Sequence, residues 1–362
     1  MPKKLKKSSL SLGARALVFG VILTLIGVFF VFEASSVLAY LNYKDVFYFT
    51  KLQLVWIVIS LAVFFFVSRF DYHRWYYFSF AMVLFTLIAL VMVLMPGIGK
   101  KVGGARRWID IGFFNFQPSE FAKLSIIIYL SSWFLYKERK RFLSFLILLG
   151  IVLFLIMNQP DMGTAMVIFS LSIGIYFVAG LGIMHLFNLL LLALGLGTLG
   201  IIMAPYRLRR LQAYLDPQAD PLGVGYQITQ IQQAFRNGGL FGKGLGFSQQ
   251  KFLFLPEAHT DSIFAIIAEE TGFIGVFFVL LIYTVFLYQI YRIALNAKDR
   301  FGKLLASGIL LYFIIHLFVN LSGLLNLFPF TGLPVPLISY GGSNLIISFI
   351  LIGIIYNIGR RL

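Results

Sequence analysis

The chain has 362 residues, of which 60% are hydrophobic, 17% are aromatic and only 12% are charged. Soluble domains usually contain roughly 25% charged residues, so this composition excludes an ordinary soluble protein and indicates helices that span a membrane. The chain has no cysteine, which excludes disulfides, thiolate nucleophiles and cysteine-ligated metals. The net charge of +16 follows no basic stripe, zinc-finger or helix-turn-helix pattern, so we expect no nucleic-acid partner.

Apolar runs of about 20 residues, the length needed to cross a bilayer, recur along the chain. The first follows the basic segment MPKKLKKSSL without a small-residue cleavage site, so we expect it to be retained as a span. The predicted spans are 14–36, 52–70, 76–95, 119–136, 162–180, 182–203, 271–291, 304–327 and 344–358, with a shorter run at 142–157. The expected fold is therefore all-α, with about ten transmembrane helices in a single membrane domain.

The distribution of basic residues predicts the orientation. With both termini in the cytoplasm, 17 of the 30 lysines and arginines fall in short inner segments, as the positive-inside rule requires. Twelve fall outside, ten of them in the loops 96–118 and 204–261. Those outer cations are candidates for binding an anionic ligand, although contact with lipid headgroups explains them equally well.

The segment 204–261, predicted to lie outside between the seventh and eighth helices, is far longer than a simple connection. Ile228, Ile231 and Phe235 predict a short amphipathic helix lying in the membrane interface, which Gly238 and Gly239 would end. The glycine-rich strip GKGLG at 242–246 is either a flexible hinge or, less simply, a phosphate cradle.

The long loop closes with LPEAHTDSIF, just before an apolar helix. A carboxylate at Asp261 is placed to act as a general base at the membrane surface. It is equally placed to cap the following helix, and on spacing alone the cap is the simpler interpretation.

Ionisable groups also occur at predicted membrane depth, where they are costly and indicate function by default. Structural pairing explains each of them about as well. These groups are the neighbours Glu120 and Lys123, Asp161 at a membrane edge, Glu269 with Glu270, and His316 with Asn320.

Five segments occur in the order found in the SEDS (shape, elongation, division and sporulation) family of bacterial wall-building membrane proteins, and the resemblance covers nearly the whole chain. The segments are GARRWIDIG with FQPSEFAKL, NQPDMGTA, GYQ, GKGLGFSQQKFLFLPEAHTDSIFAIIAEETGFIG and TGLPVPLISYGGS. The residues in GFSQQK, LPEAH and TGLPVPLISYGGS resemble the FtsW division branch more than the RodA elongation branch. At Ser262 the family more often has phenylalanine.

The resemblance implies a peptidoglycan glycosyltransferase that polymerises lipid II on the outer face of the bacterial cytoplasmic membrane. Asp261 matches the family's catalytic aspartate. The positions that match residues lining or supporting the family's central cavity are Arg107, Glu120, Lys123, Asp161, Lys251, Glu257 and His259. The expected partners are lipid II, a class B penicillin-binding protein transpeptidase, other division or elongation proteins, and membrane lipids.

For the reaction we expect Asp261 to act as general base, with Arg107, Lys123 and Lys251 stabilising the leaving pyrophosphate. No cofactor is implied with certainty. A divalent cation, Mg²⁺ or Mn²⁺, is an alternative that shares the cationic role, although the four scattered histidines argue against a zinc site. Two rival functions remain, a lipid II flippase or a non-catalytic division scaffold. The outer clustering of polar groups disfavours the first, and the charges at membrane depth are unexplained by the second.

Overall fold

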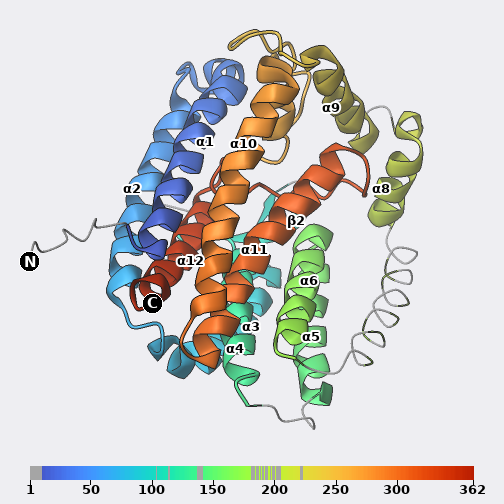
Figure 1. Ribbon diagram of the computed structural model, residues 1–362. Coiled ribbons are helices and arrows are strands. Elements are labelled where there is room, and N and C mark those ends of the chain that lie inside the picture. Colours follow the sequence, from blue (N-terminus) through green and yellow to red (C-terminus); the bar gives the residue numbers. More distant parts are fainter. Residues whose placement is uncertain are drawn as a thin grey trace, which may run out of the picture.

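The computed structural model describes residues 10–102, 104–112, 115–136, 142–180, 205–220 and 223–362, with seven separate residues between 184 and 200. These residues form a bundle of long helices (Figure 1). Six of the described helices are long and apolar enough to cross a membrane: α1 (Leu12–Tyr43), α2 (Tyr48–Arg69), α3 (Arg74–Leu94), α10 (Ile263–Asn296), α11 (Arg300–Leu324) and α12 (Gly342–Arg360).

Three further helices complete the part of the bundle that the structure describes. They are α4 (Pro118–Trp133), α5 (Phe142–Met157) and α6 (Met162–Val178). The helices at nine predicted spans are therefore confirmed, while the predicted span 182–203 lies outside the described residues. The count of ten transmembrane helices stays a prediction.

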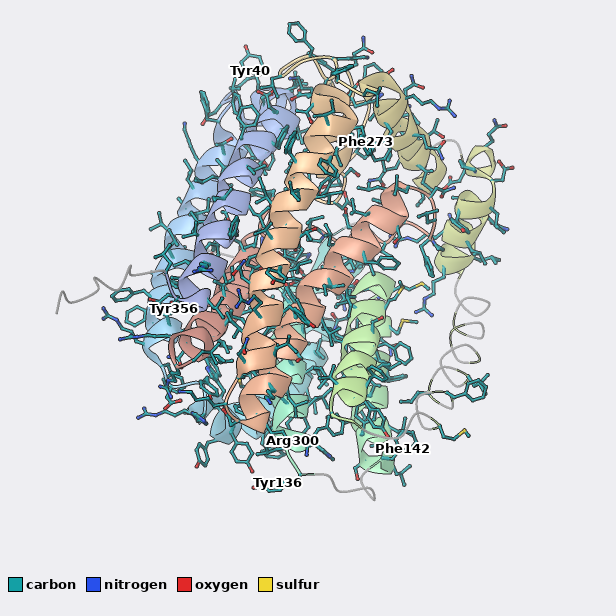
Figure 2. The ribbon with its side chains drawn as sticks, in the orientation of Figure 1. Tyr40, Tyr136, Phe142, Phe273, Arg300 and Tyr356 are labelled. Atoms are coloured by element: carbon teal, nitrogen blue, oxygen red, sulfur yellow. The ribbon has the colours of Figure 1, made fainter. Side chains whose placement is uncertain are left out.

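Large apolar side chains cover the outside of the bundle (Figure 2). Phe66 is 73% exposed, Phe80 66% and Phe154 68%. Soluble proteins rarely expose apolar surface so densely, whereas hydrocarbon solvates it without penalty. The surface therefore supports the assignment as a multi-pass membrane protein.

The connections between helices gather at the two ends of the bundle. At one end Arg361 pairs with Asp71, the Tyr72 hydroxyl donates to Asp299, and Arg300 donates to the Ala179 carbonyl. We call the opposite end, where the long 205–262 segment lies, the loop end.

The loop between α3 and α4 folds into a small antiparallel sheet at the loop end. Its strands are β1 (Gly99–Val102), β2 (Ala105–Asp110) and β3 (Asn115–Phe116), in the order β1-β2-β3. This sheet was not predicted from the sequence. The glycine pair in KKVGGARRWID is a hairpin signal that would have indicated β1 and β2.

The long loop contributes α8 (Pro205–Leu215), the 3₁₀ turn η2 (Pro217–Ala219) and α9 (Val224–Gly238). The predicted amphipathic helix is confirmed as α9, which ends at Gly238 with Gly239 as its cap. Its apolar residues Ile228 and Ile231 are each 1% exposed. The helix packs against α10 (Figure 1), so this apolar face is buried in protein, and the predicted position of the helix in the membrane interface stays a prediction.

Helix α10 begins eight residues before the predicted span, at Ile263, because the loop supplies polar partners for the two glutamates that precede the apolar run. The helix is broken once, at Gly272, where φ is +67° and ψ is −169°. Glycine adopts such a left-handed φ without the steric penalty that other residues incur. A short helical piece, 263–271, therefore lies between the end of the long loop and this break.

Candidate functional site

Asp261 lies at the loop end, immediately before α10, and is 8% exposed. The cap of α10 is Ser262, and no side chain makes a capping hydrogen bond there. The simpler interpretation of Asp261 as a helix cap is therefore wrong. The carboxylate instead accepts from the Ser262 hydroxyl at 3.4 Å and lies 3.4 Å from the Thr260 hydroxyl, whose single proton it shares with Glu257, and it makes no cap bond that would tie it to the helix.

The backbone of Asp261 is fixed from α11. The side-chain amide of Asn320 donates to the carbonyl oxygens of Asp261 and Leu333, each at 2.7 Å. Gly332 lies against the carboxylate itself, because a Cβ atom added there would sit 3.0 Å from Asp261 Oδ2. One amide thus joins the start of α10 to the segment between α11 and α12, and a glycine leaves room beside the carboxylate.

Burial, together with the negative charge of Glu257, raises the pKa of Asp261 to about 7. Glu257 is exposed and accepts a hydrogen bond from the Thr260 hydroxyl at 3.2 Å. A carboxyl group with a pKa near neutrality exchanges protons readily at physiological pH, as a general base must.

His259 is held between two aromatic rings. Its ring centroid lies 4.6 Å from that of Phe49 and 5.3 Å from that of Tyr340, and its carbonyl accepts from the Tyr340 N–H at 3.0 Å. Burial lowers the pKa of His259, against the opposing influence of Glu257. The imidazole is therefore neutral at pH 7, and its contacts fix the loop just before Asp261.

Lys123 is completely buried on α4. Its ammonium donates to Glu120 Oε1 at 2.7 Å, so the predicted pairing of these two residues is confirmed. It lies 2.9 Å from His316 Nε2. Because His316 Nδ1 must donate to the Tyr312 carbonyl 2.8 Å away, Nε2 carries the lone pair and accepts from Lys123.

Asn320 and His316 lie one turn apart on the same face of α11, as the sequence indicated. Asn320 binds the backbone of Asp261, and His316 binds the ammonium of Lys123. The Oδ1 atom of Asn320 and the Oε2 atom of Glu120 are buried without a hydrogen-bond partner among the described residues. This face of α11 therefore links Asp261 to the buried ion pair.

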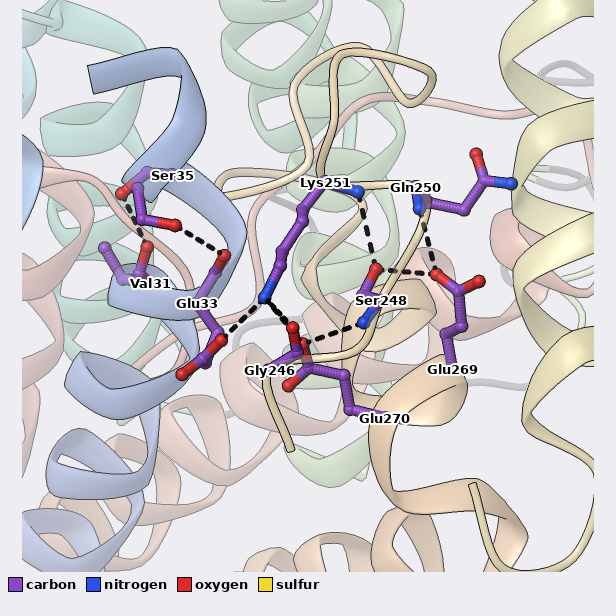
Figure 3. Close-up of polar contacts among 10 residues, drawn as sticks. Val31, Glu33, Ser35, Gly246, Ser248, Gln250, Lys251, Glu269 and Glu270 are labelled. Atoms are coloured by element: carbon purple, nitrogen blue, oxygen red, sulfur yellow. Dashed lines mark hydrogen bonds and ion pairs between the residues drawn. The ribbon is translucent and has the colours of Figure 1, made fainter. Parts of the chain in front are cut away.

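Lys251 is the centre of a second buried cluster, at the junction of α1, the long loop and α10 (Figure 3). Its ammonium lies 3.0 Å from Glu33 Oε2, 3.3 Å from Glu270 Oε1 and 2.7 Å from the Gly246 carbonyl. An ammonium has three donors, and these acceptors account for all three. A role at the pyrophosphate stays a prediction for Lys251, and it requires one of these partners to be exchanged.

Glu269, next to Glu270 on α10, holds the loop from the other side. It accepts from the Ser248 hydroxyl at 2.6 Å and from the Gln250 N–H at 3.1 Å (Figure 3). The backbone N–H groups of Lys243 and Gly244 donate to carbonyls of α10. The glycine-rich strip is thus fastened to α10, and two N–H groups that a phosphate cradle would use are occupied.

Arg107 and Asp161 meet at the turn between α5 and α6. Arg107, on β2, donates through Nε to the Gln159 carbonyl at 3.1 Å and through Nη2 to the Pro160 carbonyl. Asp161 caps α6, accepting from the backbone N–H and the hydroxyl of Thr164 at 3.1 and 2.8 Å. Both predicted site residues therefore lie at the loop end.

The eight predicted site residues thus fall into four separate places rather than one. Asp261, Glu257 and His259 share the end of the loop, Glu120 and Lys123 form a buried pair, and Arg107 lies beside Asp161. Lys251 belongs to the separate Glu33 cluster. Within the described part of the chain, no ion pair joins Asp261 to a lysine or arginine.

Sequence reasoning passed over Glu33 and Gly332. Glu33 is a carboxylate inside the first predicted span, and that rarity was a usable signal. Gly332 belongs to the TGLPVP segment, but nothing in the sequence shows that it packs against Asp261.

Among the residues that the structure describes, no three histidine, aspartate or glutamate side chains gather closely enough to hold a metal ion. The donors among those described residues therefore do not fit a metal site built from protein groups alone.

A family model described as cell cycle protein, which unites FtsW, RodA and SpoVE, matches residues 14–362. The chain belongs to the SEDS family. This SEDS protein is 41% identical to the probable peptidoglycan glycosyltransferase FtsW of Trichlorobacter lovleyi, over 94% of this chain and 91% of the relative. It is 42% identical to stage V sporulation protein E of Bacillus subtilis, over 94% of each chain.

Solved structures agree with the sequence relatives. The SEDS chain superimposes with a TM-score of 0.79 and 28% identity on a chain from a peptidoglycan synthase complex, covering 96% of this chain and 97% of that one. That structure is described as showing the coordination of polymerization and crosslinking. RodA of Thermus thermophilus gives a TM-score of 0.71 at 25% identity, over 95% of each chain.

Proposed function

We propose that this SEDS protein is a peptidoglycan glycosyltransferase that polymerises lipid II for cell-wall synthesis, with Asp261 as its general base. FtsW-named relatives at about 40% identity carry the name of this activity. The single observation that supports the role of Asp261 is the state of its carboxylate: it is buried, it does not cap α10, and its pKa is about 7.

The reaction that this assignment requires is a substitution at the anomeric carbon of MurNAc. The 4-hydroxyl of GlcNAc on one lipid II molecule gives its proton to the Asp261 carboxylate while its oxygen bonds to that carbon on a second molecule. The bond from the carbon to the phosphate oxygen breaks, and undecaprenyl diphosphate leaves with the electron pair. Asp261 then returns the proton to solvent or to the leaving group.

The cations near the site fall into two kinds in this proposal, according to the partners that they now bind. Arg107 is bound only through neutral carbonyls in the contacts it makes to residues 159 and 160, so its charge is available to a phosphate. Lys123 and Lys251 face carboxylates, and they act at the diphosphate only if they exchange those partners. In this proposal Glu120, Asp161, Glu257 and His259 support the central cavity that the family resemblance implies.

The site is assigned to the extracytoplasmic side of the membrane, with both termini in the cytoplasm and about ten spans. The distribution of basic residues supports this orientation. A class B transpeptidase is the proposed partner, because a structural relative belongs to a complex that coordinates polymerization with crosslinking.

A reconstitution separates this function from its rivals. Proteoliposomes containing the protein, its transpeptidase partner and labelled lipid II are assayed for glycan chains by gel and for labelled lipid exposed to an external reagent. Chain formation is expected. Translocation without polymer would replace the proposal with a flippase. The absence of both activities would replace it with a scaffold.

A further inference from the structure

The break in α10 at Gly272 frees backbone N–H groups, and the long loop binds them. The N–H group of Phe273 donates to the Gly239 carbonyl at 2.9 Å. The N–H group of Ile274 donates to the Leu240 carbonyl at 3.2 Å. In a regular helix these two groups would donate to carbonyls four residues earlier in α10. The loop therefore takes the place of one helical turn.

The two carbonyls that the same break frees are bound by the same loop. They belong to Glu269 and Glu270, and they accept from the N–H groups of Lys243 at 2.9 Å and Gly244 at 3.0 Å. Residues 239–244 thus replace both broken helical hydrogen bonds, donor and acceptor alike. Because a backbone group left unpaired in a membrane costs several kcal/mol, this pairing makes the break tolerable at membrane depth. We call residues 239–247 the bridging segment.

The bridging segment fits α10 closely because glycine meets glycine. A Cβ atom added to Gly242 would sit 2.2 Å from the Glu270 carbonyl oxygen, and one added to Gly272 would sit 2.4 Å from the Gly242 nitrogen. Gly242 also has a φ of +79°, which favours glycine. The backbone of the segment is therefore held directly against the backbone of α10.

The outward side of the bridging segment is apolar. Phe241 is 79% exposed and Phe247 71%, and Leu240 and Leu245 are exposed as well. This surface continues onto α10, where the exposed ring of Phe273 begins the apolar run (Figure 2). A soluble protein surface rarely carries so many large apolar groups side by side.

The charges of this part of the loop are turned inward. Lys243 lies 3.4 Å from Glu269 Oε1, and Lys251, just beyond the segment, is buried between Glu33 and Glu270. Each lysine therefore has a carboxylate partner on the protein side. Apolar side chains outward and paired charges inward are the arrangement expected of a surface that faces lipid.

We propose that the bridging segment anchors the long loop in the membrane, in the leaflet at the loop end. Leu240, Phe241, Leu245 and Phe247 lie at the boundary between headgroups and acyl chains. Lipid is the partner, rather than a second protein, because the apolar surface continues the face of α10 that the bilayer covers. The loop that carries Asp261 is thereby fixed to the membrane surface through α10, whichever reaction it performs.

Spin labels measure this insertion directly, because the chain has no cysteine of its own. Phe241→Cys is labelled in the purified full-length protein in nanodiscs. Collisions of the label are measured with oxygen, which concentrates among acyl chains, and with a nickel chelate, which stays in water.

The ratio of oxygen to nickel collisions at Phe241→Cys should be several-fold higher than at Lys44→Cys, an exposed position after α1. It should approach the ratio at Phe277→Cys, which is exposed on α10 about one turn beyond Phe273. Phe247→Cys should behave like Phe241→Cys. A ratio equal to that of Lys44→Cys would place the segment in water and overturn the proposal. A label shielded from both reagents would show that protein covers the surface, and would overturn it too.

A pair of alanine variants tests whether the contact with α10 holds the segment in place. Gly242→Ala puts a methyl group against the Glu270 carbonyl, so the collision ratio should fall at both labels. Gly246→Ala is the matched control: Gly246 has a similar φ of +83°, but an added Cβ atom meets nothing within 4 Å. An equal fall in the two variants would assign the effect to backbone strain and remove the role of the contact.

Neither readout requires turnover. A protein that polymerises lipid II but has a water-exposed Phe241 label would lose the anchor and keep the proposed function. A protein with an inserted label and no polymerisation would keep the anchor and lose the function.

Discussion

At Asp261, burial and the neighbouring charge of Glu257 act in the same direction on the carboxyl group, and the pKa rises to about 7. The base form exists only above that pH. Polymerisation should therefore increase as the pH rises through about 7.

Glu257→Gln removes one of the two causes and lowers the pKa of Asp261. The limb of the pH profile of kcat/KM should then move to lower pH, because the base form persists in more acidic solution. Initial rates between pH 5.5 and 8.5 measure this shift. A limb that stays in place in the variant would show that another group titrates.

The raised pKa of Asp261 also makes the free energy of unfolding depend on pH. The ordinary pKa is 3.8, so between about pH 4 and 7 the folded chain retains a proton that the unfolded chain has lost. The free energy of unfolding therefore falls as the pH rises through this window.

Asp261→Asn should remove this pH-dependent loss, which amounts to the order of 4 kcal/mol for a shift of about three pKa units. The variant should melt at a higher temperature than the wild type at pH 8 and at a similar temperature at pH 4. Asp45→Asn is the control, since Asp45 is paired with Lys51 and has a lowered pKa. A wild type whose melting temperature is unchanged between those pH values would contradict the raised pKa.

Among the elements, α10 depends most on contacts that the sequence alone does not show. Its nine-residue piece before Gly272 is held at one end by Asn320 and at the other by the cluster around Lys251. The presence of the helix followed from its apolar run, because hydrophobicity over about 20 residues is a local property. Its early start did not, because it depends on loop residues distant in the chain.

Lys251→Met tests the cluster. It leaves Glu33 and Glu270 buried without their cation, and removing one partner of a buried ion pair typically costs about 3 kcal/mol or more. The variant should lose thermal stability, and Glu270→Gln in the same chain should restore part of it. A Lys251→Met protein as stable as the wild type but unable to polymerise lipid II would instead support contact between Lys251 and the substrate.

In the candidate site too, contacts between residues close in the sequence could be predicted, and contacts between distant residues could not. The Glu120–Lys123 pair follows from a spacing of three residues on one helix, and it was predicted. The contact of Gly332 with Asp261 joins residues 71 positions apart and required the fold. The family motifs identified Asp261, whereas spacing alone favoured a cap that the structure does not contain.

For the whole molecule, the proposed orientation places the 205–262 segment outside the cell. The chain has no cysteine, so single cysteines report orientation without background labelling. Lys44→Cys and Gln249→Cys should react with a membrane-impermeant maleimide added to intact spheroplasts, and Lys298→Cys should react only after lysis. The reverse pattern would contradict the orientation.

The most direct test of the central claim is polymerisation by purified Asp261→Asn in the presence of the transpeptidase partner. Asparagine keeps the size of aspartate but is no base, so glycan chain formation should fall at least about a hundredfold. Lipid II binding and folding should remain, and Asp45→Asn should polymerise like the wild type. Undiminished chain formation by Asp261→Asn would contradict the assignment of Asp261 as the general base.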